Sequence, residues 1–279
     1  MDCLQREDIP GAEYEVEELL GHVLSKPRRA WRLDPDRPLT QEQDQRFRDL
    51  VERRARRVPL QYVIGQETFC GMFVEVTPDV LIPRPETEGV VDAARRALGD
   101  PTMAAESPVI VDIGTGSGCI ALVLAREFPD AVVYATDCSR AALAVARRNA
   151  ERQGLANRIV FCEGDLFDPL IRGGVIADLV VSNPPYVAEE EWPVLQPEVR
   201  CEPRCALNGG AGGLEYYRRI AAEATMVLAK DGIVVLEIGY GQAEAVRLLM
   251  EKAGFDVERI VPDDQGIPRV VVAWRRHFA

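Results

Sequence analysis

The stretch Asp112-Ile-Gly-Thr-Gly-Ser-Gly118 has the composition of a ligand-binding loop. It follows an apolar run and opens a helical stretch, so its glycines allow close backbone approach and the helix N-terminus offers free N–H groups. Asp137 comes 25 residues after Asp112, at the end of the next expected strand, where its carboxylate can accept both hydroxyl hydrogens of an adenosine ribose. These features alone fit NAD and S-adenosylmethionine about equally well, and a merely tight strand–helix turn is the alternative.

The spacing of the glycines favours S-adenosylmethionine over NAD. Gly114, Gly116 and Gly118 follow the pattern G-x-G-x-G, whereas dinucleotide-binding loops follow G-x-G-x-x-G. Asp112 also adds a carboxylate beside the loop, which suits a cationic ligand better than a pyrophosphate.

A second pair of candidate residues follows the third expected strand. Asp165 could accept the exocyclic amino hydrogens of an adenine, and Leu166 could pack on the ring. Acids after strands are common in loops, so this pair is a weak signal by itself.

The turn Asn183-Pro-Pro-Tyr186 is the most specific chemical signal in the chain. Two consecutive prolines have no N–H and restrict the backbone, so the carbonyl groups point in set directions. The side-chain oxygen of Asn183 adds an acceptor beside them, and Tyr186 supplies an aromatic face. This combination predicts a receptacle for a planar amide or an exocyclic amine, and an incidental proline turn is the alternative.

These loops need parallel strands to bring them together. Short β-branched runs predict buried strands at 108–113, 131–136, 158–162, 177–182 and 232–238, with two further strands at 255–260 and 269–276. The stretches between them predict helices at 118–128, 139–153 and 214–229. Alternating strands and helices indicate a parallel sheet covered on both faces, with ligands at the carboxyl ends of the strands.

The N-terminal part has a different pattern. Spaced apolar residues predict helices at 13–24 and 41–58, and the run from Thr68 to Leu81 predicts a short β-hairpin that connects two domains. Residues 46–57 hold six arginines against two acids. A solvated helix face and a docking face for an acidic partner are both compatible with this run.

Composition excludes several classes of protein. The 279 residues carry a formal charge of −12, and because residues 1–60 hold 12 basic against 13 acidic residues, −11 of it lies in residues 61–279. Such a surface would repel a nucleic-acid backbone on average. Only His22 and His277 are histidines, and the seven cysteines contain no C-x-x-C pair, so a zinc site is poorly supported. We expect a reduced, soluble, cytoplasmic protein, because no secretory h-region and no long apolar run occurs.

The turn Asn183-Pro-Pro-Tyr186 resembles the signature of S-adenosylmethionine-dependent methyltransferases that act on planar nitrogen. The tract Leu81-Ile-Pro-Arg-Pro-Glu-Thr-Glu88 narrows the resemblance to the protein-(glutamine-N5) methyltransferase family and looks like its release-factor branch rather than its ribosomal-protein branch. The resemblance runs from about Arg57 to Arg269 and includes VDIGTGSGCIAL, ATD, GDLF, VSNPPYV, EPRCAL and GGLEYYRRI. The first 55 residues match only as a helical module of the right size.

The resemblance implies a class I methyltransferase-type, Rossmann-like α/β fold. It implies a mostly parallel seven-stranded sheet and an N-terminal helical domain joined to it by a β-hairpin. We therefore expect a substrate-docking domain at residues 1–66, a hairpin linker at 67–82 and a methyltransferase domain at 83–279.

The resemblance also assigns the site residues. The expected cofactor contacts are Gly114, Thr115, Gly116, Ser117, Gly118, Asp137, Asp165, Leu166 and Asn183. The expected substrate contacts are Asn183, Pro184, Pro185 and Tyr186, with Asn183, Pro184 and Tyr186 acting in catalysis. Leu166 stands where the family often has an aromatic residue, and Cys201 stands where it usually has Phe.

The activity implied is methyl transfer from S-adenosylmethionine, without a metal, to the glutamine N5 in the Gly-Gly-Gln motif of class I peptide chain release factors. The release factor would be the partner, with the arginine run as a candidate contact, and neither nucleic acid nor membrane is expected. An amino-methyltransferase acting on a ribosomal-protein glutamine or on a nucleic-acid adenine is the alternative, because it shares the four-residue signature. A nicotinamide-dependent oxidoreductase would explain the glycine loop but not the Pro-Pro-Tyr turn.

Overall fold

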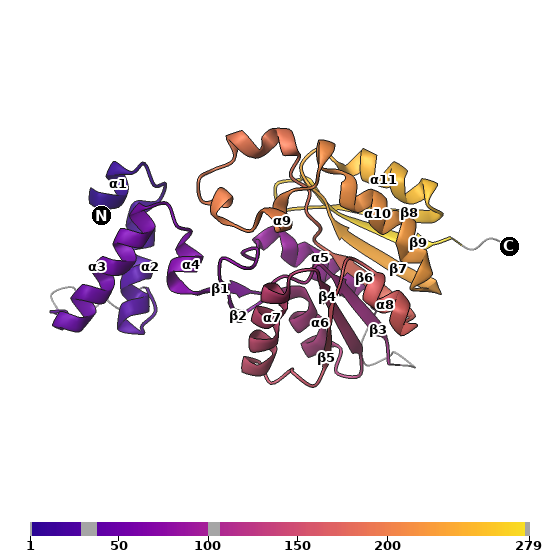
Figure 1. Cartoon of the computed structure of the whole chain (residues 1–279), viewed down its shortest axis with the longest axis horizontal. Helices are drawn as coiled ribbons and strands as arrows, with labels where there is room; N and C mark the ends of the chain where they lie inside the picture. Colours follow the sequence, from indigo (N-terminus) through magenta and orange to yellow (C-terminus); the bar gives the residue numbers. More distant parts are fainter. Residues whose placement is uncertain (1, 29–37, 100–106, 277–279) are drawn as a thin grey trace. The chain divides into compact units, whose positions relative to one another are not determined.

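A single sheet of seven strands organises the larger part of the chain (Figure 1). The computed structural model describes residues 2–28, 38–99 and 107–276. The strand order is β5-β4-β3-β6-β7-β9-β8, and neighbouring strands are parallel except that β9 runs antiparallel to β7 and β8. The strands are β3 (Val109–Ile113), β4 (Val132–Asp137), β5 (Ile159–Glu163), β6 (Ala177–Ser182), β7 (Leu228–Glu237), β8 (Phe255–Pro262) and β9 (Pro268–Arg275). The predicted mostly parallel, seven-stranded α/β fold is confirmed.

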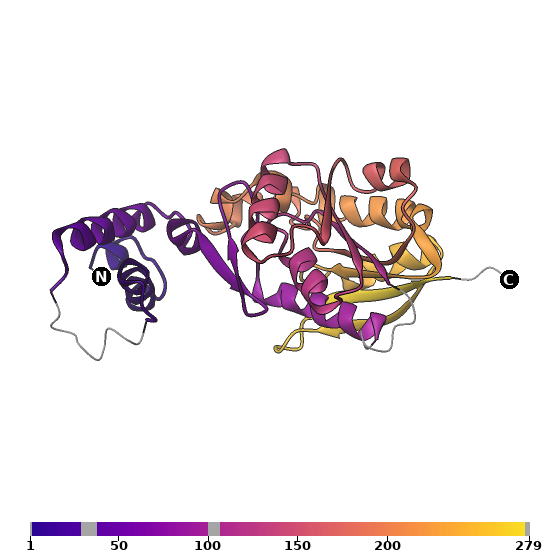
Figure 2. The same ribbon diagram turned by 90° about the horizontal axis from the view of Figure 1, so that it is seen from below.

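Helices cover both faces of the sheet, which can be followed in Figures 1 and 2. Side chains of β3, β6 and β7 alternate between two buried clusters, as the pleat of a strand requires. One cluster includes α5 (Glu88–Leu98), α6 (Cys119–Glu127) and α7 (Arg140–Arg152). The other includes α8 (Asp168–Gly173), α10 (Glu215–Glu223) and α11 (Ala243–Lys252). The near-continuous apolar runs in the strands follow from this double burial.

The helix predicted over 214–229 was wrong at its C-terminal end. Helix α10 ends at Glu223 and a short 3-10 turn, η6 (Ala224–Met226), follows it. Leu228 then begins β7, where it pairs with Ala177 of β6 and is buried. A short apolar run suits a helix or a strand equally, and here the pairing with β6 decides between them.

The first compact unit of the chain consists of residues up to Gln66 together with Leu195–Cys201. Its helices are α1 (Asp2–Arg6), α2 (Ala12–Leu24), α3 (Gln41–Ala55) and α4 (Leu60–Ile64). A small core forms where α2, α3 and α4 meet, from Leu19, Val23, Leu50 and Val63. Thr40 begins α3 with a capping box, because its hydroxyl accepts from Gln43 N and the Gln43 side chain accepts from Thr40 N.

The arginine run on α3 is largely occupied within this unit. Arg54 is 3% exposed, and its guanidinium donates to Glu15 (Nε–Oε2 2.5 Å) and to Glu198 (Nη1–Oε1 2.9 Å). Arg57 also pairs with Glu198, and Arg53 donates to the carbonyls of Tyr62 and Val63. Three of the six arginines therefore serve to hold the unit together, and a buried Arg54 offers nothing to a partner.

The second unit contains Glu67–Val194 and Glu202 onward. The hairpin strands β1 (Gln66–Phe69) and β2 (Met72–Glu75) are joined at Cys70 and Gly71, which both have positive φ. Phe69, Met72 and Val74 are buried in the cluster that contains α5 and α6, so the hairpin is part of this unit's core. The remaining short elements of this unit are η2 (Pro85–Thr87), η3 (Glu189–Val194), α9 (Arg204–Leu207) and η5 (Ala211–Gly213), whereas η4 (Val199–Cys201) belongs to the first unit.

We predict that Arg54→Ala destabilises the first unit by about 3–5 kcal/mol, because it removes the buried partner of Glu15 and one of the two arginines that pair with Glu198. The measurement is amide hydrogen exchange in α2 and α3, which reports the free energy of local opening. Arg48→Ala is the matched control, since Arg48 lies on the same helix in an exposed pair with Asp44 and its loss should leave the protection almost unchanged. Equal protection in the two variants would contradict this assignment.

Candidate active site

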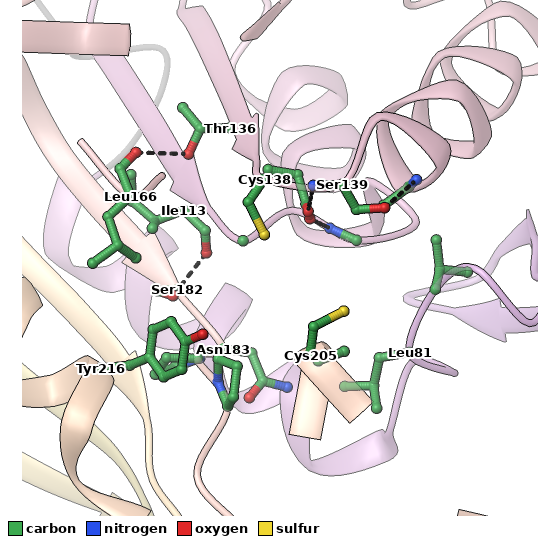
Figure 3. Close-up of a pocket in the computed structure, with 18 of the residues that line it drawn as sticks. Leu81, Ile113, Thr136, Cys138, Ser139, Leu166, Ser182, Asn183, Cys205 and Tyr216 are labelled. Atoms are coloured by element: carbon green, nitrogen blue, oxygen red, sulfur yellow. Dashed lines mark hydrogen bonds between the residues drawn. The ribbon is translucent and has the colours of Figure 1, made fainter. Parts of the chain in front are cut away.

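A pocket lies where the carboxyl ends of β3, β4, β5 and β6 meet (Figure 3). The strand order reverses between β3 and β6, and such switch points are where open α/β sheets bind ligands. Among the residues predicted from the sequence, the lining contains Gly114, Gly116, Asp137, Asp165, Leu166, Asn183, Pro184 and Pro185. Four separate strand ends thus contribute to one cavity, and Thr115, Ser117, Gly118 and Tyr186 are outside its lining.

The three glycines of the loop have different surroundings. All three have positive φ, at +69° for Gly114, +55° for Gly116 and +84° for Gly118. A Cβ on Gly114 or Gly116 would meet no atom within 4 Å, whereas one on Gly118 would lie 3.1 Å from Cβ of Ala146 on α7. The first two glycines therefore leave open space beside the pocket, and the third permits close packing of the loop on a helix.

Thr115 and Ser117 are buried, lie outside the pocket lining and hold the glycine loop through hydrogen bonds. Thr115 Oγ1 donates to Asp112 Oδ2 at 2.6 Å, and Ser117 O accepts from Asn149 Nδ2 at 2.9 Å. Asn149 also accepts from Glu75 N and donates to Glu75 O. Strand β2, the glycine loop and α7 are thereby joined by one buried amide.

Asp112 is a buried carboxylate with one free oxygen. Oδ2 accepts from Thr115 Oγ1 and from Ala121 N at 3.2 Å, while Oδ1 has no partner among the residues that the structure describes. Burial raises the pKa of Asp112 to about 7, against the lowering by its two hydrogen bonds, and the charge of Asp137 adds to the rise. A cation placed beside Oδ1 would compensate this charge.

Asp137 is the last residue of β4 and is held by backbone donors. Its carboxylate accepts from Gly116 N at 2.9 Å and from Ser139 N at 2.8 Å. Burial raises the pKa of Asp137, and the two backbone hydrogen bonds oppose that rise. Each oxygen can accept a second hydrogen bond, so the carboxylate can still bind a pair of vicinal hydroxyls.

Asp165 and Leu166 follow β5 and line the same pocket as the Asn183 turn. Leu166 is buried with φ +45°, and its carbonyl accepts from Thr136 Oγ1 at 3.3 Å. Asp165 Oδ2 accepts from Arg219 Nη2 at 2.7 Å, so this carboxylate has a cationic partner that the sequence did not indicate. Arg219 lies over the ring of Tyr216 at 5.9 Å.

Several lining residues escaped sequence reasoning. Tyr216, Cys138 and Cys205 all face the pocket in Figure 3. Tyr216 lies within the tract GGLEYYRRI and Cys205 within EPRCAL, but no chemistry was assigned to either. Cys138 directly follows Asp137 at the end of β4, whereas Tyr216 and Cys205 lie between β6 and β7, in a long connection whose course no local pattern predicts.

In the Asn183 turn, the side-chain amide has its nitrogen bonded and, within the part of the chain that the structure describes, its oxygen unpaired. Asn183 Nδ2 donates to Thr87 Oγ1 at 3.1 Å, and Asn183 Oδ1 has no partner among the described residues. Tyr186 packs against the buried cluster that includes α10 and α11, and its backbone carbonyl accepts from Gln242 Nε2 at 2.9 Å. Burial raises the pKa of Tyr186, so its hydroxyl stays neutral.

The described residues contain no group of three or more His, Cys, Asp or Glu side chains arranged to hold a metal ion. All seven cysteines are thiols, and Cys201 and Cys205 fall into different compact units. His22 lies in the first unit beside Arg46, and His277 lies outside the described residues. None of the helices in the described ranges is long and apolar enough to cross a membrane.

Comparison with known sequences gives strong matches over nearly the whole chain. The PrmC N-terminal domain family matches residues 1–65, and the methyltransferase small domain family matches residues 87–199. A release factor glutamine methyltransferase of Geobacter sulfurreducens is 44% identical over 269 residues, which cover 96% of this chain and 91% of that protein. One from Moorella thermoacetica is 44% identical over 265 residues, covering 94% and 91%.

Comparison with solved structures supports the fold. A methyltransferase from Pyrococcus furiosus matches with a TM-score of 0.54 and 22% identity, over 75% of this chain and 91% of that one. The hMettl16 catalytic domain in complex with an MAT2A 3′UTR hairpin matches with a TM-score of 0.57 and 18% identity, over 82% and 83%. At such identities the likeness concerns the architecture alone.

We predict that Asp112→Asn makes the ligand-free protein more stable at neutral pH. An acid whose pKa is raised from 3.8 to about 7 on folding binds more protons folded than unfolded, so its contribution to stability falls as pH rises between these values. The advantage of Asp112→Asn over the unsubstituted protein should grow from pH 4 to pH 7 and then level off, reaching a few kcal/mol at most. Urea unfolding at a series of pH values measures it, and a constant difference across that range would contradict the burial argument.

Proposed function

Because the chain belongs to the release factor glutamine methyltransferase family, we propose that it transfers a methyl group from S-adenosylmethionine to the side-chain amide nitrogen of the glutamine in the Gly-Gly-Gln motif of class I release factors. The observation that carries the proposal is the free Oδ1 of Asn183 beside the pocket lined by the glycine loop. Such an acceptor suits a planar –NH2 group, which glutamine provides.

The pocket has the features that S-adenosylmethionine requires. Gly114 and Gly116 leave space for a ligand against the backbone, and the unpartnered Oδ1 of Asp112 lies behind the same loop, where positive charge is favourable. Asp137 would accept the ribose hydroxyls, while Leu166 and Tyr216 would contact the adenine. Bound there, the cofactor supplies a methyl group already activated by its cationic sulfur.

The residues of the chain then have to position a poor nucleophile. An amide nitrogen has its lone pair delocalised into the carbonyl, so alignment and electrostatic stabilisation are the means available to the protein. Asn183 Oδ1 and the Pro184 carbonyl would each accept one N–H of the glutamine amide and direct its nitrogen toward the methyl group. Both acceptors also stabilise the positive charge that grows on the nitrogen, and Tyr186 supports the turn from its buried side. The spare proton leaves to water after transfer.

A radiolabel assay tests the function. The protein is incubated with methyl-labelled S-adenosylmethionine and a class I release factor, with the same factor carrying Gly-Gly-Ala as the matched control. Label should appear in the Gly-Gly-Gln peptide and be absent from the control. Transfer to DNA, RNA or a ribosomal protein in place of the release factor would overturn the proposal. Since the expected substrate takes part in translation, we place the activity in the cytoplasm.

We predict that Asn183→Ala lowers kcat by roughly 30- to 1,000-fold, since removing one preorganised hydrogen-bonding group from a transition state costs about 2–4 kcal/mol. Asn157→Ala, at an exposed position after α7, is the matched control and should retain the original rate. Single-turnover kinetics with the labelled cofactor separate this effect from cofactor binding. An Asn183→Ala protein with near-normal turnover would remove Asn183 from the mechanism.

We predict that Gly116→Ala weakens S-adenosylmethionine binding by about tenfold or more, because its Cβ would enter the space left for the ligand. Gly174→Ala provides the control, since Gly174 ends α8 with φ +63°, has the same open surroundings and lies outside the pocket lining. Both variants should lose about 1–2 kcal/mol of stability from the left-handed backbone. Calorimetric titration should show weakened binding in the first variant only, and equal affinities would argue against a ligand at Gly116.

A further inference from the structure

A buried carboxylate adjoins the Asn183 turn and has not been used by the mechanism above. Glu237 ends β7 and is 2% exposed, and its Oε2 has no hydrogen-bond partner among the described residues. Ser182 of β6 pairs with Leu236 of β7, so the next residues, Asn183 and Glu237, are neighbours across the sheet. By the alternation of the strands both belong to the face covered by α5, where Val181 and Val235 are buried.

Thr87 lies between these two side chains. It occupies the N-cap position of α5, where a threonine hydroxyl ordinarily accepts from a backbone N–H of the first turn. Here no such cap bond forms. The buried hydroxyl instead accepts from Asn183 Nδ2 at 3.1 Å, and it lies within hydrogen-bonding reach of Glu237, whose pKa it lowers. The side chains of Asn183, Thr87 and Glu237 therefore form a row of three hydrogen-bonding groups.

We propose that Thr87 and Glu237 are positioning residues that keep the Asn183 amide in one of its two orientations, with Nδ2 held by Thr87 and Oδ1 left for the substrate amide. The proposal rests on the proposed function of Asn183 and concerns how that residue is oriented. Neither Thr87 nor Glu237 lines the pocket, so both act through Asn183.

The direction of donation along this row depends on the charge of Glu237. An ionised carboxylate only accepts, so the single Thr87 hydrogen must point to Glu237, and the Thr87 oxygen must accept from Asn183 Nδ2. A protonated Glu237 can donate to Thr87 instead. The Thr87 hydrogen is then available to Asn183 Oδ1, and the amide can turn its –NH2 toward the substrate. The –NH2 of Asn183 would then face the –NH2 of the substrate amide. Because both are donors, no hydrogen bond could hold the substrate.

The surroundings of Glu237 place this change near neutral pH. Burial raises the pKa of Glu237 to about 7, and the hydrogen bond with Thr87 acts against that rise. Among charged neighbours, Glu86 raises the pKa while Arg269 and Arg84 lower it. The hydroxyls of Tyr186 and Tyr217 also lie within its field, and burial keeps both neutral. Activity should therefore fall as pH drops through this value.

The test compares Thr87→Val with Thr87→Ser, at saturating cofactor and with the release factor as acceptor. Valine keeps the shape of threonine without its hydroxyl, so we expect kcat to fall about tenfold or more, since one buried donor loses its partner. Serine keeps the hydroxyl and should restore kcat to within about threefold. The KM for S-adenosylmethionine should change in neither variant. Equal kcat values for Thr87→Val and Thr87→Ser would overturn the proposal.

Glu237→Gln supplies a second readout that a purely structural role would not move. Glutamine can donate as well as accept, so the direction of the hydrogen bonds between Asn183, Thr87 and residue 237 is no longer fixed. We expect kcat to fall, and the decrease of kcat on the acid side of pH 7 to disappear from its pH profile. Because the substitution removes a buried charge, the unfolding midpoint at pH 8 should be no lower than that of the unsubstituted protein. An unchanged acid limb, or a loss of stability that parallels the loss of rate, would contradict the proposal.

A readout independent of activity separates this inference from the proposed function. The side-chain amide resonances of Asn183, identified by their absence in Asn183→Ala, should shift in Thr87→Val and stay near their original position in Thr87→Ser. If the release factor receives no methyl group and these shifts still occur, the function fails and the orientation stands. If methyl transfer occurs and the resonances do not move, the inference alone fails.

Discussion

The pairing of β3 with β6 determines where the chemistry of this protein can take place. These two strands are sequence-distant but adjacent in the sheet, with Ile113 opposite Ser182 at their carboxyl ends. The hydroxyl of Ser182 donates to Ile113 O at 2.7 Å in a fully buried position, which joins the ends of the two strands. The glycine loop begins immediately after Ile113 and the Asn183 turn immediately after Ser182. A group bound against the first must therefore lie next to the second.

Buried polar groups without partners concentrate at this edge of the sheet. Asp112 Oδ1, Asn183 Oδ1 and Glu237 Oε2 are three of the six such side-chain atoms among residues 2–28, 38–99 and 107–276. Each costs folding free energy, because a desolvated acceptor has lost its water. A folded protein tolerates such unpaired atoms where they contribute to ligand binding or catalysis. Of the three residues, Asn183 lines the pocket, Asp112 directly precedes the lining residue Ile113, and Glu237 is linked to Asn183 through Thr87. The cost is therefore localised at the edge of the sheet where a ligand would bind.

Local patterns predict the frame of this structure but not its long-range contacts. The strands were found because buried parallel strands are continuous apolar runs, and the turn at Asn183 because proline restricts the backbone by itself. The burial of Arg54 depends on Glu198, which is 144 residues away and joins the first compact unit through Leu195–Cys201. Nothing within the arginine run marks Arg54 as different from Arg48. Thr87 likewise occupies the N-cap position of α5, and only its contact with Asn183 after β6 shows that its hydroxyl is used elsewhere.

The acidity of the chain has a more specific meaning once the carboxylates are located. The formal charge of −12 counts Asp112 and Glu237 as fully ionised, yet burial raises the pKa of each to about 7. At neutral pH both are therefore partly protonated in the ligand-free protein. A cation bound beside Asp112 would favour the ionised form, since an opposite charge nearby lowers the pKa of an acid. The ionised Asp112 carboxylate therefore costs folding free energy in the ligand-free protein and would attract a cationic ligand. With such a ligand bound nearby, Asp112 would be fully ionised. A neutral residue at position 112 would make the ligand-free protein more stable and would remove the buried carboxylate that, under the proposed function, favours a cationic ligand at the adjoining glycine loop.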